Sequence, residues 1–285
     1  MPYAIERART TRIVQSRHNS RVKELRLAFD RPGKATSGLV AIEGERLLAE
    51  ALRSGLTPQV IFVESGRTHL LDALGQSPQE RQRLAQAEIL ELPAEILHGA
   101  MATESPQGIA ALLTPPSSEP ADLFPSNKQA LVLVAAALQD PGNLGTLIRS
   151  AEAFGATGLL LLSGSVNPWN PKVVRSSAGS VFRLPVVAAS MEQGIGWLRE
   201  HRVRLYATAA EGDLPSTEAA LAGPCAIAIG NEGAGLAPEL LAASDARLSI
   251  PCPGPVESLN AAVAGSILLY EAARQRQASS KLGAH

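Results

Sequence analysis

The chain has 285 residues, enough for one large or two medium domains, and its 45% apolar and 19% charged residues are typical of a folded protein. No apolar run approaches the roughly 18 residues that a membrane span needs, and no apolar signal-peptide core follows the N-terminal arginines. Two cysteines and five scattered histidines form neither a disulfide framework nor a metal-ligand cluster, so we expect a cytoplasmic, reduced and metal-free protein.

Basic residues are concentrated at the N-terminus. The net charge of the whole chain is −1, yet residues 1–34, here called the basic arm, hold nine Lys and Arg against three acidic residues. Clustered cations bind polyanions by releasing counterions, which makes the arm a candidate phosphate-contacting segment. A solvated tail without a partner explains the composition equally well. The candidate contacts in the arm are Arg17, Arg21 and Lys23.

Helix and strand signals alternate between residues 19 and 113. The spacing of Val22, Leu25 and Phe29 predicts a helix over 19–29. Such alternation is typical of an α/β layered domain. Further helices are predicted at 44–54 and 94–101, and strands at 39–42, 60–63, 88–92 and 109–113.

Residues 114–127 are predicted to be a linker, because four prolines with Ser, Asp and Asn between them disfavour a regular element. The linker separates a domain at 1–113 from a domain at 128–285. In the second domain, apolar runs predict parallel strands covered by helices on both faces. The strands are expected at 130–137, 158–162, 204–208, 226–229 and 247–250, and the helices at 143–154, 171–177, 191–201, 237–243 and 258–277.

The first candidate motif, residues 139–150, lies where a strand gives way to a helix. Strand carboxyl ends and helix N-termini are where open α/β sheets bind ligands. Asn143 begins the predicted helix, and Arg149 follows on the same element. Taken alone, an N-cap at Asn143 and a surface charge at Arg149 are the simpler interpretation.

The second motif, residues 229–236, reads IGNEGAGL. Glycines after a strand let the backbone approach a ligand closely. The spacing differs from the dinucleotide fingerprint, and Glu232 would repel a diphosphate, so a neutral or cationic cofactor fits better. A plain glycine-rich connector is the alternative, which the embedded Asn231 and Glu232 make weaker.

The third motif, residues 250–260, reads IPCPGPVESLN. Three prolines stiffen this loop, and Ser258 is placed to cap or precede the final helix. Asn260 presents its amide near the N-terminus of that helix, and Cys252 is interpreted as a small packing residue. The chain contains no G-x-S-x-G, P-loop, H-E-x-x-H or C-x-x-C motif, so hydrolase, NTPase, zinc and redox functions lack their required parts.

In this order and spacing, the three motifs resemble those of the SpoU/TrmH branch of the SPOUT methyltransferases. The matching stretches are DPGNLGTLIRSAEAFGA, IGNEGAGL and IPCPGPVESLNAAVAGSILLYEAARQR, with KVVRSSAGSVFRLP between the first two. The resemblance covers essentially the whole second domain. The stretches NSRVK and AIEGER make the first domain similar to a ribosomal-protein-like α/β substrate-binding domain, which adds Arg46 to the candidate RNA contacts.

The resemblance implies a parallel α/β sheet with a C-terminal trefoil knot, and a homodimer whose active site is completed across its interface. It implies S-adenosylmethionine (AdoMet) as methyl donor and an RNA ribose 2′-hydroxyl as acceptor. Family proposals let Arg149 activate this hydroxyl; because arginine is not deprotonated in proteins, we favour phosphate orientation and alkoxide stabilisation. The implied functional residues are Asn143, Arg149, Glu232, Ser258 and Asn260, and the implied cofactor pocket comprises Thr208, Ala209, Gly230, Ile250, Ser258, Leu259 and Asn260.

Three alternatives stay open. The additional N-terminal domain favours ribosomal RNA (rRNA) as substrate over transfer RNA (tRNA), although a tRNA ribose methyltransferase is the next candidate. A non-catalytic RNA-binding scaffold is disfavoured, because the set of motif residues is complete. An enzyme that methylates a base is disfavoured by Arg149 in the first motif and by ESLN in the third.

Overall fold

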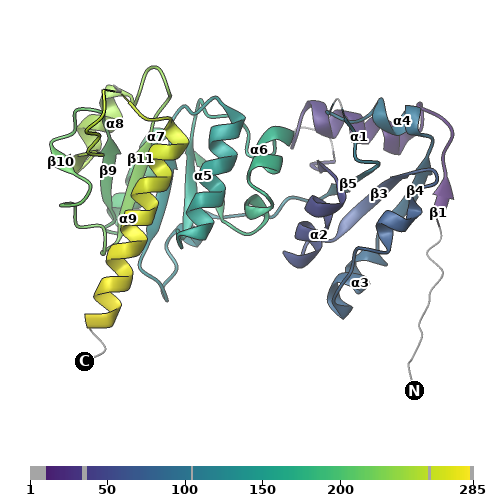
Figure 1. Ribbon diagram of the computed structural model, residues 1–285, viewed down its shortest axis with the longest axis horizontal. Coiled ribbons are helices and arrows are strands. Elements are labelled where there is room, and N and C mark those ends of the chain that lie inside the picture. Colours follow the sequence, from purple (N-terminus) through teal and green to yellow (C-terminus); the bar gives the residue numbers. More distant parts are fainter. Residues whose placement is uncertain (1–10, 34–36, 104, 256–257, 283–285) are drawn as a thin grey trace. The chain divides into compact units, whose positions relative to one another are not determined.

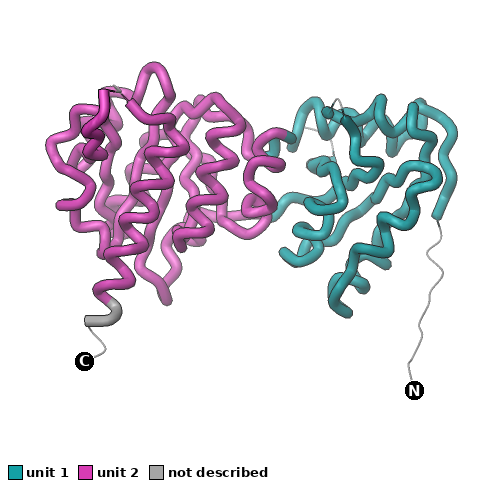
Figure 2. Tube along the Cα trace, viewed as in Figure 1, with its two compact units in different colours: residues 1–116, 169–171 teal, residues 117–168, 172–285 magenta. Residues whose placement is uncertain are grey.

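The computed structural model describes residues 11–33, 37–103, 105–255 and 258–282. The chain divides into two compact units (Figure 2): unit 1, residues 1–116 with 169–171, and unit 2, residues 117–168 with 172–285. Of the basic arm, residues 1–10 and 34 lie outside the described residues. No helix in the part that is described is long and apolar enough to cross a membrane.

Unit 1 is built on a five-stranded sheet (Figure 1). In spatial order its strands are β1 (Thr11–Ile13), β4 (Glu88–Leu92), β3 (Pro58–Glu64), β5 (Ile109–Leu113) and β2 (Val40–Glu43). β5 runs antiparallel to both of its neighbours, whereas β1, β4 and β3 are parallel. Apolar residues of α1, such as Leu25, pack with Phe62 and Leu90 of the sheet. The helices are α1 (Ser20–Asp30), α2 (Glu45–Arg53), η1 (Thr68–Leu71), α3 (Pro78–Leu84) and α4 (Ala94–His98).

Unit 2 is built on a seven-stranded sheet in which every pair is parallel. In spatial order the strands are β10 (Leu214–Pro215), β12 (Ala246–Ser249), β9 (Arg204–Thr208), β11 (Cys225–Ile229), β6 (Leu131–Ala135), β7 (Gly158–Leu162) and β8 (Val186–Ala189). The central strands β11, β6 and β7 are buried along their whole length, because helices cover both faces.

The helices of unit 2 form one layer on each face of this sheet. On one face, α5 (Pro141–Ala153) packs against α9 (Ala261–Leu282). On the other, α7 (Met191–Glu200) and α8 (Pro238–Ala243) place Leu198 and Leu240 against Val132 and Val134 of β6. The short helices η2 (Pro120–Leu123), α6 (Pro171–Ser176) and η3 (Ser180–Phe182) complete the unit.

The C-terminal half of α9 is tied to the loops that lead into β6 and β11. The guanidinium of Arg276 donates hydrogen bonds to the main-chain carbonyls of Gln129 (2.9 Å), Ala130 (2.9 Å) and Gly223 (2.7 Å). Such charge-assisted hydrogen bonds are stronger than neutral ones. Arg276 therefore anchors the last helix at the amino ends of the strands, opposite the edge where the motifs lie.

The predicted α/β class and the parallel sheet are confirmed. The expectation that 114–127 contains no regular element was wrong. The 3₁₀ helix η2 lies there, and Leu123 is buried in unit 2 with its carbonyl accepting a hydrogen bond from Thr157 (2.7 Å). The trefoil knot stays a prediction.

Candidate active site

The carboxyl ends of all seven parallel strands lie at one edge of the unit 2 sheet, and this edge holds a cavity of about 440 Å³. The volume lies in the range of small-molecule sites in proteins. Segments after β9, β11 and β12 line the cavity together with the start of α9. Asn260 is not among the lining residues. The other six residues of the predicted cofactor pocket all line the cavity: Thr208, Ala209, Gly230, Ile250, Ser258 and Leu259.

A tight loop after β11 forms one wall of the cavity. Asn231 and Gly235 exchange two main-chain hydrogen bonds of 3.0 and 2.9 Å. The Asn231 side chain accepts hydrogen bonds from the amides of Gly233 and Ala234 and donates one to the carbonyl of Ala137 (3.2 Å). In the sequence Asn231 stands out only as a polar residue among glycines, whereas these contacts show that its side chain organises the loop.

The charge of the wall favours some ligands over others. Among the described lining residues, Glu232 is the only acidic one and no Lys or Arg occurs. A negative wall suits a neutral or cationic ligand better than a phosphate. Cys252 also lines the cavity and is exposed, so its interpretation as a packing residue was wrong. The described residues contain no group of three or more His, Cys, Asp or Glu arranged to hold a metal ion.

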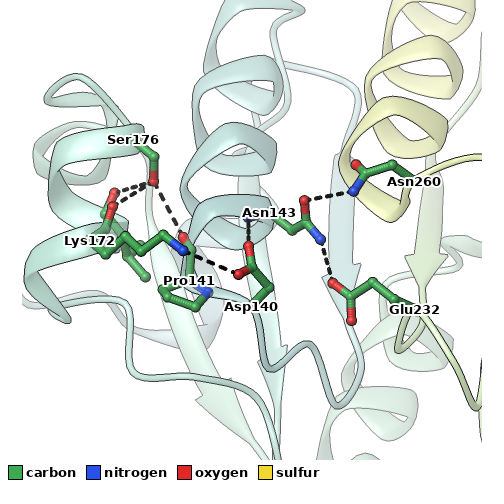
Figure 3. A network of polar contacts seen from close by, with 8 residues as sticks. Asp140, Pro141, Asn143, Lys172, Ser176, Glu232 and Asn260 are labelled. Carbon is green, nitrogen blue, oxygen red and sulfur yellow. Dashed lines mark hydrogen bonds and ion pairs between the residues drawn. The ribbon is translucent and has the colours of Figure 1, made fainter.

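A polar network joins the three motifs (Figure 3). The Asn143 side chain donates a hydrogen bond to Oε1 of Glu232 (2.5 Å) and accepts one from Nδ2 of Asn260 (3.0 Å). These residues lie on α5, on the loop after β11 and at the start of α9. They meet because β6 and β11 are neighbours in the sheet and α9 packs on α5. Glu232 lies in both the network and the cavity wall, so the two are continuous.

The structure decides which residues cap α5 and α9, two points that the sequence left open. Asp140, not Asn143, caps α5, and its Oδ1 accepts a hydrogen bond from the Asn143 amide (2.7 Å). This hydrogen bond, with help from Lys172, lowers the pKa of Asp140. At α9 the cap is Asn260 rather than Ser258, because its Oδ1 accepts hydrogen bonds from the amides of Ala262 and Val263. Ser258 instead lines the cavity.

Arg149 is not part of the network. Its side chain is exposed on α5, and within the described residues its guanidinium forms no hydrogen bond or ion pair. The following residue, Ser150, is hydrogen-bonded to Ser266 of α9 (2.7 Å). The Arg149 side chain is therefore available to contact a bound molecule or another chain.

The predicted RNA contacts of unit 1 differ in their surroundings. Arg17, Lys23 and Arg46 are exposed. Arg21 lies on α1 between two carboxylates, with Nη1 2.9 Å from Glu24 and Nε 3.1 Å from Glu88. Its charge is therefore compensated within unit 1, which makes it a weaker candidate for a phosphate contact than the three exposed cations.

Comparisons with known proteins identify the family of the chain. Residues 130–270 match the SpoU rRNA Methylase family, and residues 19–111 match the MRM3-like substrate binding domain. The 23S rRNA (guanosine(2553)-2′-O)-methyltransferase RlmP of Bacillus subtilis is 34% identical over 258 residues, which span 90% of this chain and 97% of that protein.

Two further proteins extend the comparison. The 23S rRNA (uridine(2479)-2′-O)-methyltransferase of Streptomyces viridochromogenes is 34% identical over 80% of this chain and 83% of its own. The crystal structure of an AdoMet-bound rRNA methyltransferase from Sinorhizobium meliloti has a TM-score of 0.79 at 29% identity, and the match covers 93% of this chain and 98% of that one. The chain therefore belongs to the SpoU rRNA methylase family.

Proposed function

We propose that the protein transfers a methyl group from AdoMet to a ribose 2′-hydroxyl of rRNA. Glu232 lines the cavity and also accepts a hydrogen bond from Asn143, so the cavity and the network of Asn143, Glu232 and Asn260 form one continuous site. This observation carries the proposal. The proposed reaction is taken from two relatives, both of which are named as 23S rRNA 2′-O-methyltransferases.

The cavity residues fit AdoMet, which when bound supplies an electrophilic methyl group on a positively charged sulfur. The carboxylate of Glu232 in the wall complements a cationic ligand. Glycine at 230, 233 and 235 lets the main chain approach the ligand without interference from side chains. Ile250 and Leu259 offer apolar surface to a planar base, and Thr208, Ala209 and Ser258 complete the proposed contacts.

The residues around Asn143 have the properties needed to handle a ribose. A 2′-hydroxyl is a poor nucleophile and must lose its proton during in-line attack. Asn143, fixed by Glu232 and Asn260, orients the sugar at the mouth of the cavity. Because arginine keeps its proton in proteins, we assign to Arg149 the substrate phosphate and the developing alkoxide rather than the role of base.

The exposed position of Arg149 supports a homodimer. Val263, Ile267 and Tyr270 are large apolar residues at helical spacing on α9, with 48%, 38% and 55% of their surface exposed. Such an apolar stripe is typical of a surface that another protein covers. We propose that a second copy covers it, and that Arg149 of each copy completes the site of its partner.

Mixed dimers test the exchange of Arg149. Arg149→Ala and Asn143→Ala homodimers are both expected to be inactive. A mixed dimer has one site with an intact Asn143 from one copy and an intact Arg149 from the other, so coexpression should restore methyl transfer. Failure of a purified mixed dimer to regain activity would show that Arg149 acts within its own chain.

Tyr270→Glu should give a monomer in analytical ultracentrifugation.

Unit 1 is proposed to bind the RNA through Arg17, Lys23 and Arg46, with Arg21 in a supporting position. Phosphate contacts of this kind supply affinity without sequence information. Arg17→Gln combined with Lys23→Gln is therefore expected to weaken RNA binding at every sequence and to reduce its salt dependence. A cytoplasmic location also stays a prediction, which cell fractionation can test.

Transfer of label from radioactive AdoMet to purified RNA fractions tests the proposed substrate. We expect label in 23S rRNA, none with Arg149→Ala, and AdoMet affinity unchanged in that variant. Label only in tRNA would favour the tRNA ribose methyltransferase. AdoMet binding without transfer would indicate a wrong or immature RNA substrate, and the absence of both AdoMet binding and transfer would favour the scaffold.

A further inference from the structure

The N-cap of α5, Asp140, precedes Asn143 of the proposed site by three residues. Asp140 follows the strand β6 and its Oδ1 accepts a hydrogen bond from the Asn143 amide at 2.7 Å. Pro141 occupies the first helical position, where its fixed φ is favourable. At Gly142, a Cβ atom would lie 2.9 Å from Asp140 Oδ1, so glycine leaves room for the carboxylate to fold over the first turn.

This cap differs from a capping box in a way that concerns the site. In a capping box, the side chain three residues after the cap turns back to the amide of the cap residue. Asn143 stands at that position, yet its side-chain amide points to Glu232 and Asn260 instead (Figure 3). Asp140 therefore holds the backbone of Asn143 while the side chain stays available to the network.

The second carboxylate oxygen of Asp140 connects α5 to α6. Nζ of Lys172 lies 3.4 Å from Oδ2, and Ser176 Oγ donates to the carbonyl of Pro141 (3.3 Å). A Cβ atom at Gly145 would lie 1.9 Å from Ser176 Oγ and 2.6 Å from the carbonyl oxygen of Val173, so α6 can pack this closely on α5 only because residue 145 has no side chain. The start of α5 is thus held by its cap and by a closely packed neighbour.

We infer that Asp140 is a positioning residue, which fixes the Asn143 side chain between Glu232 and Asn260 by anchoring the amide of Asn143. The inference rests on the proposed methyl transfer for its kinetic consequence. Asp140 lies outside the set of cavity-lining residues, so its loss should affect the rate of transfer and leave AdoMet binding alone.

Three variants separate positioning from stability. Asp140→Ala removes the cap, whereas Asp140→Asn keeps a capping oxygen and loses only the charge opposite Lys172. Ser190→Ala is the matched control, because Ser190 Oγ caps α7 through the amide of Gln193 (3.2 Å) in the same unit. Both alanine variants should lower Tm by about 2–4 °C.

Only Asp140→Ala is expected to lower kcat, by about fivefold to tenfold, with KM for RNA and AdoMet within twofold of the native values. Asp140→Asn should restore kcat. Equal kcat values for Asp140→Ala and Ser190→Ala would overturn the inference, and so would an Asp140→Asn variant as slow as Asp140→Ala, because the charge rather than the cap would then matter.

A second measurement does not depend on activity. The side-chain amide signal of Asn143 in a ¹H–¹⁵N spectrum, assigned by its loss in Asn143→Ala, should move toward that of free asparagine in Asp140→Ala and stay in place in Ser190→Ala. An unmoved signal in Asp140→Ala would refute the positioning role. If the wild-type protein methylates no RNA, the proposed function fails, and the amide signal still decides the role of Asp140.

Discussion

Replacement of Gly230 by alanine is expected to weaken AdoMet binding by at least about tenfold, because the added methyl group has no space. A Cβ atom there would lie 2.4 Å from the carbonyl carbon of Gly235, 2.5 Å from its oxygen and 2.7 Å from the amide of Leu236. All three are backbone atoms, so no side chain can rotate away. The loop closed by the two hydrogen bonds between Asn231 and Gly235 must open instead.

The magnitude follows from these contacts. Overpacking of a tight site costs about 1–3 kcal/mol, and each lost main-chain hydrogen bond costs about 1 kcal/mol. We therefore expect a loss of about 2–4 kcal/mol in the free energy of unfolding. Since Asn231, Gly233 and Gly235 line the cavity, the AdoMet Kd should rise by at least about tenfold, or about 1.4 kcal/mol.

Gly196→Ala is the matched control for this prediction. Gly196 lies inside α7, and a Cβ atom there would meet nothing within 4 Å. Alanine should therefore stabilise the helix by about 0.5–1 kcal/mol and leave the AdoMet Kd unchanged. Calorimetric titration with AdoMet and urea unfolding measure both quantities. A Gly230→Ala protein that binds AdoMet with native affinity would refute the proposed pocket.

Two further predictions concern stability. Arg276→Met should lower the free energy of unfolding by about 3 kcal/mol, because it removes the charged donor from four main-chain carbonyls. Arg274→Met removes one partner of the buried carboxylate of Glu271, which keeps its hydrogen bond from Gln275, and should cost only about 1 kcal/mol in urea unfolding; a loss equal to that of Arg276→Met would contradict the anchoring role. Burial raises the pKa of Glu152, but hydrogen bonds from Arg183 outweigh it, so the pKa of Glu152 is lowered overall. The contribution of the ionised Glu152 to the free energy of unfolding is therefore present above about pH 4.3, where the unfolded carboxyl is ionised. This contribution is lost as the pH falls through the lower pKa of the folded state. Glu152→Gln should cost about 0.5–1 kcal/mol at pH 7, and this cost should shrink as the pH falls below about 4.3; a cost that does not change with falling pH would exclude this ion pair as its cause.

The sequence predicted the interior of the fold well. The strands at 88–92, 109–113, 158–162 and 204–208 have the predicted bounds. Apolar runs of this length, bounded by turn residues, indicate strands before any partner is known. The edge strands β1, β8 and β10 were not predicted, because they have two to four residues and depend on one neighbouring strand for their hydrogen bonds.

The motifs single out Asn143, Glu232 and Asn260 as candidates, but the sequence does not show how these residues are connected. Asn143 and Glu232 are 89 positions apart, and only the adjacency of β6 and β11 brings them together. The sequence also left the helix caps undecided. Asp140, Asn143, Ser258 and Asn260 all have cap-forming side chains, and the sequence alone does not tell which of them accepts the amide hydrogen bonds.

The proposed reaction places the methyl group on a ribose oxygen of rRNA. Digestion of RNA labelled with radioactive AdoMet to nucleosides, followed by mass spectrometry, locates the added mass on the sugar or on the base. We predict a 2′-O-methylnucleoside from 23S rRNA, with the methyl group retained on the ribose fragment. A methyl group on the base fragment would contradict the roles assigned to Asn143 and Arg149.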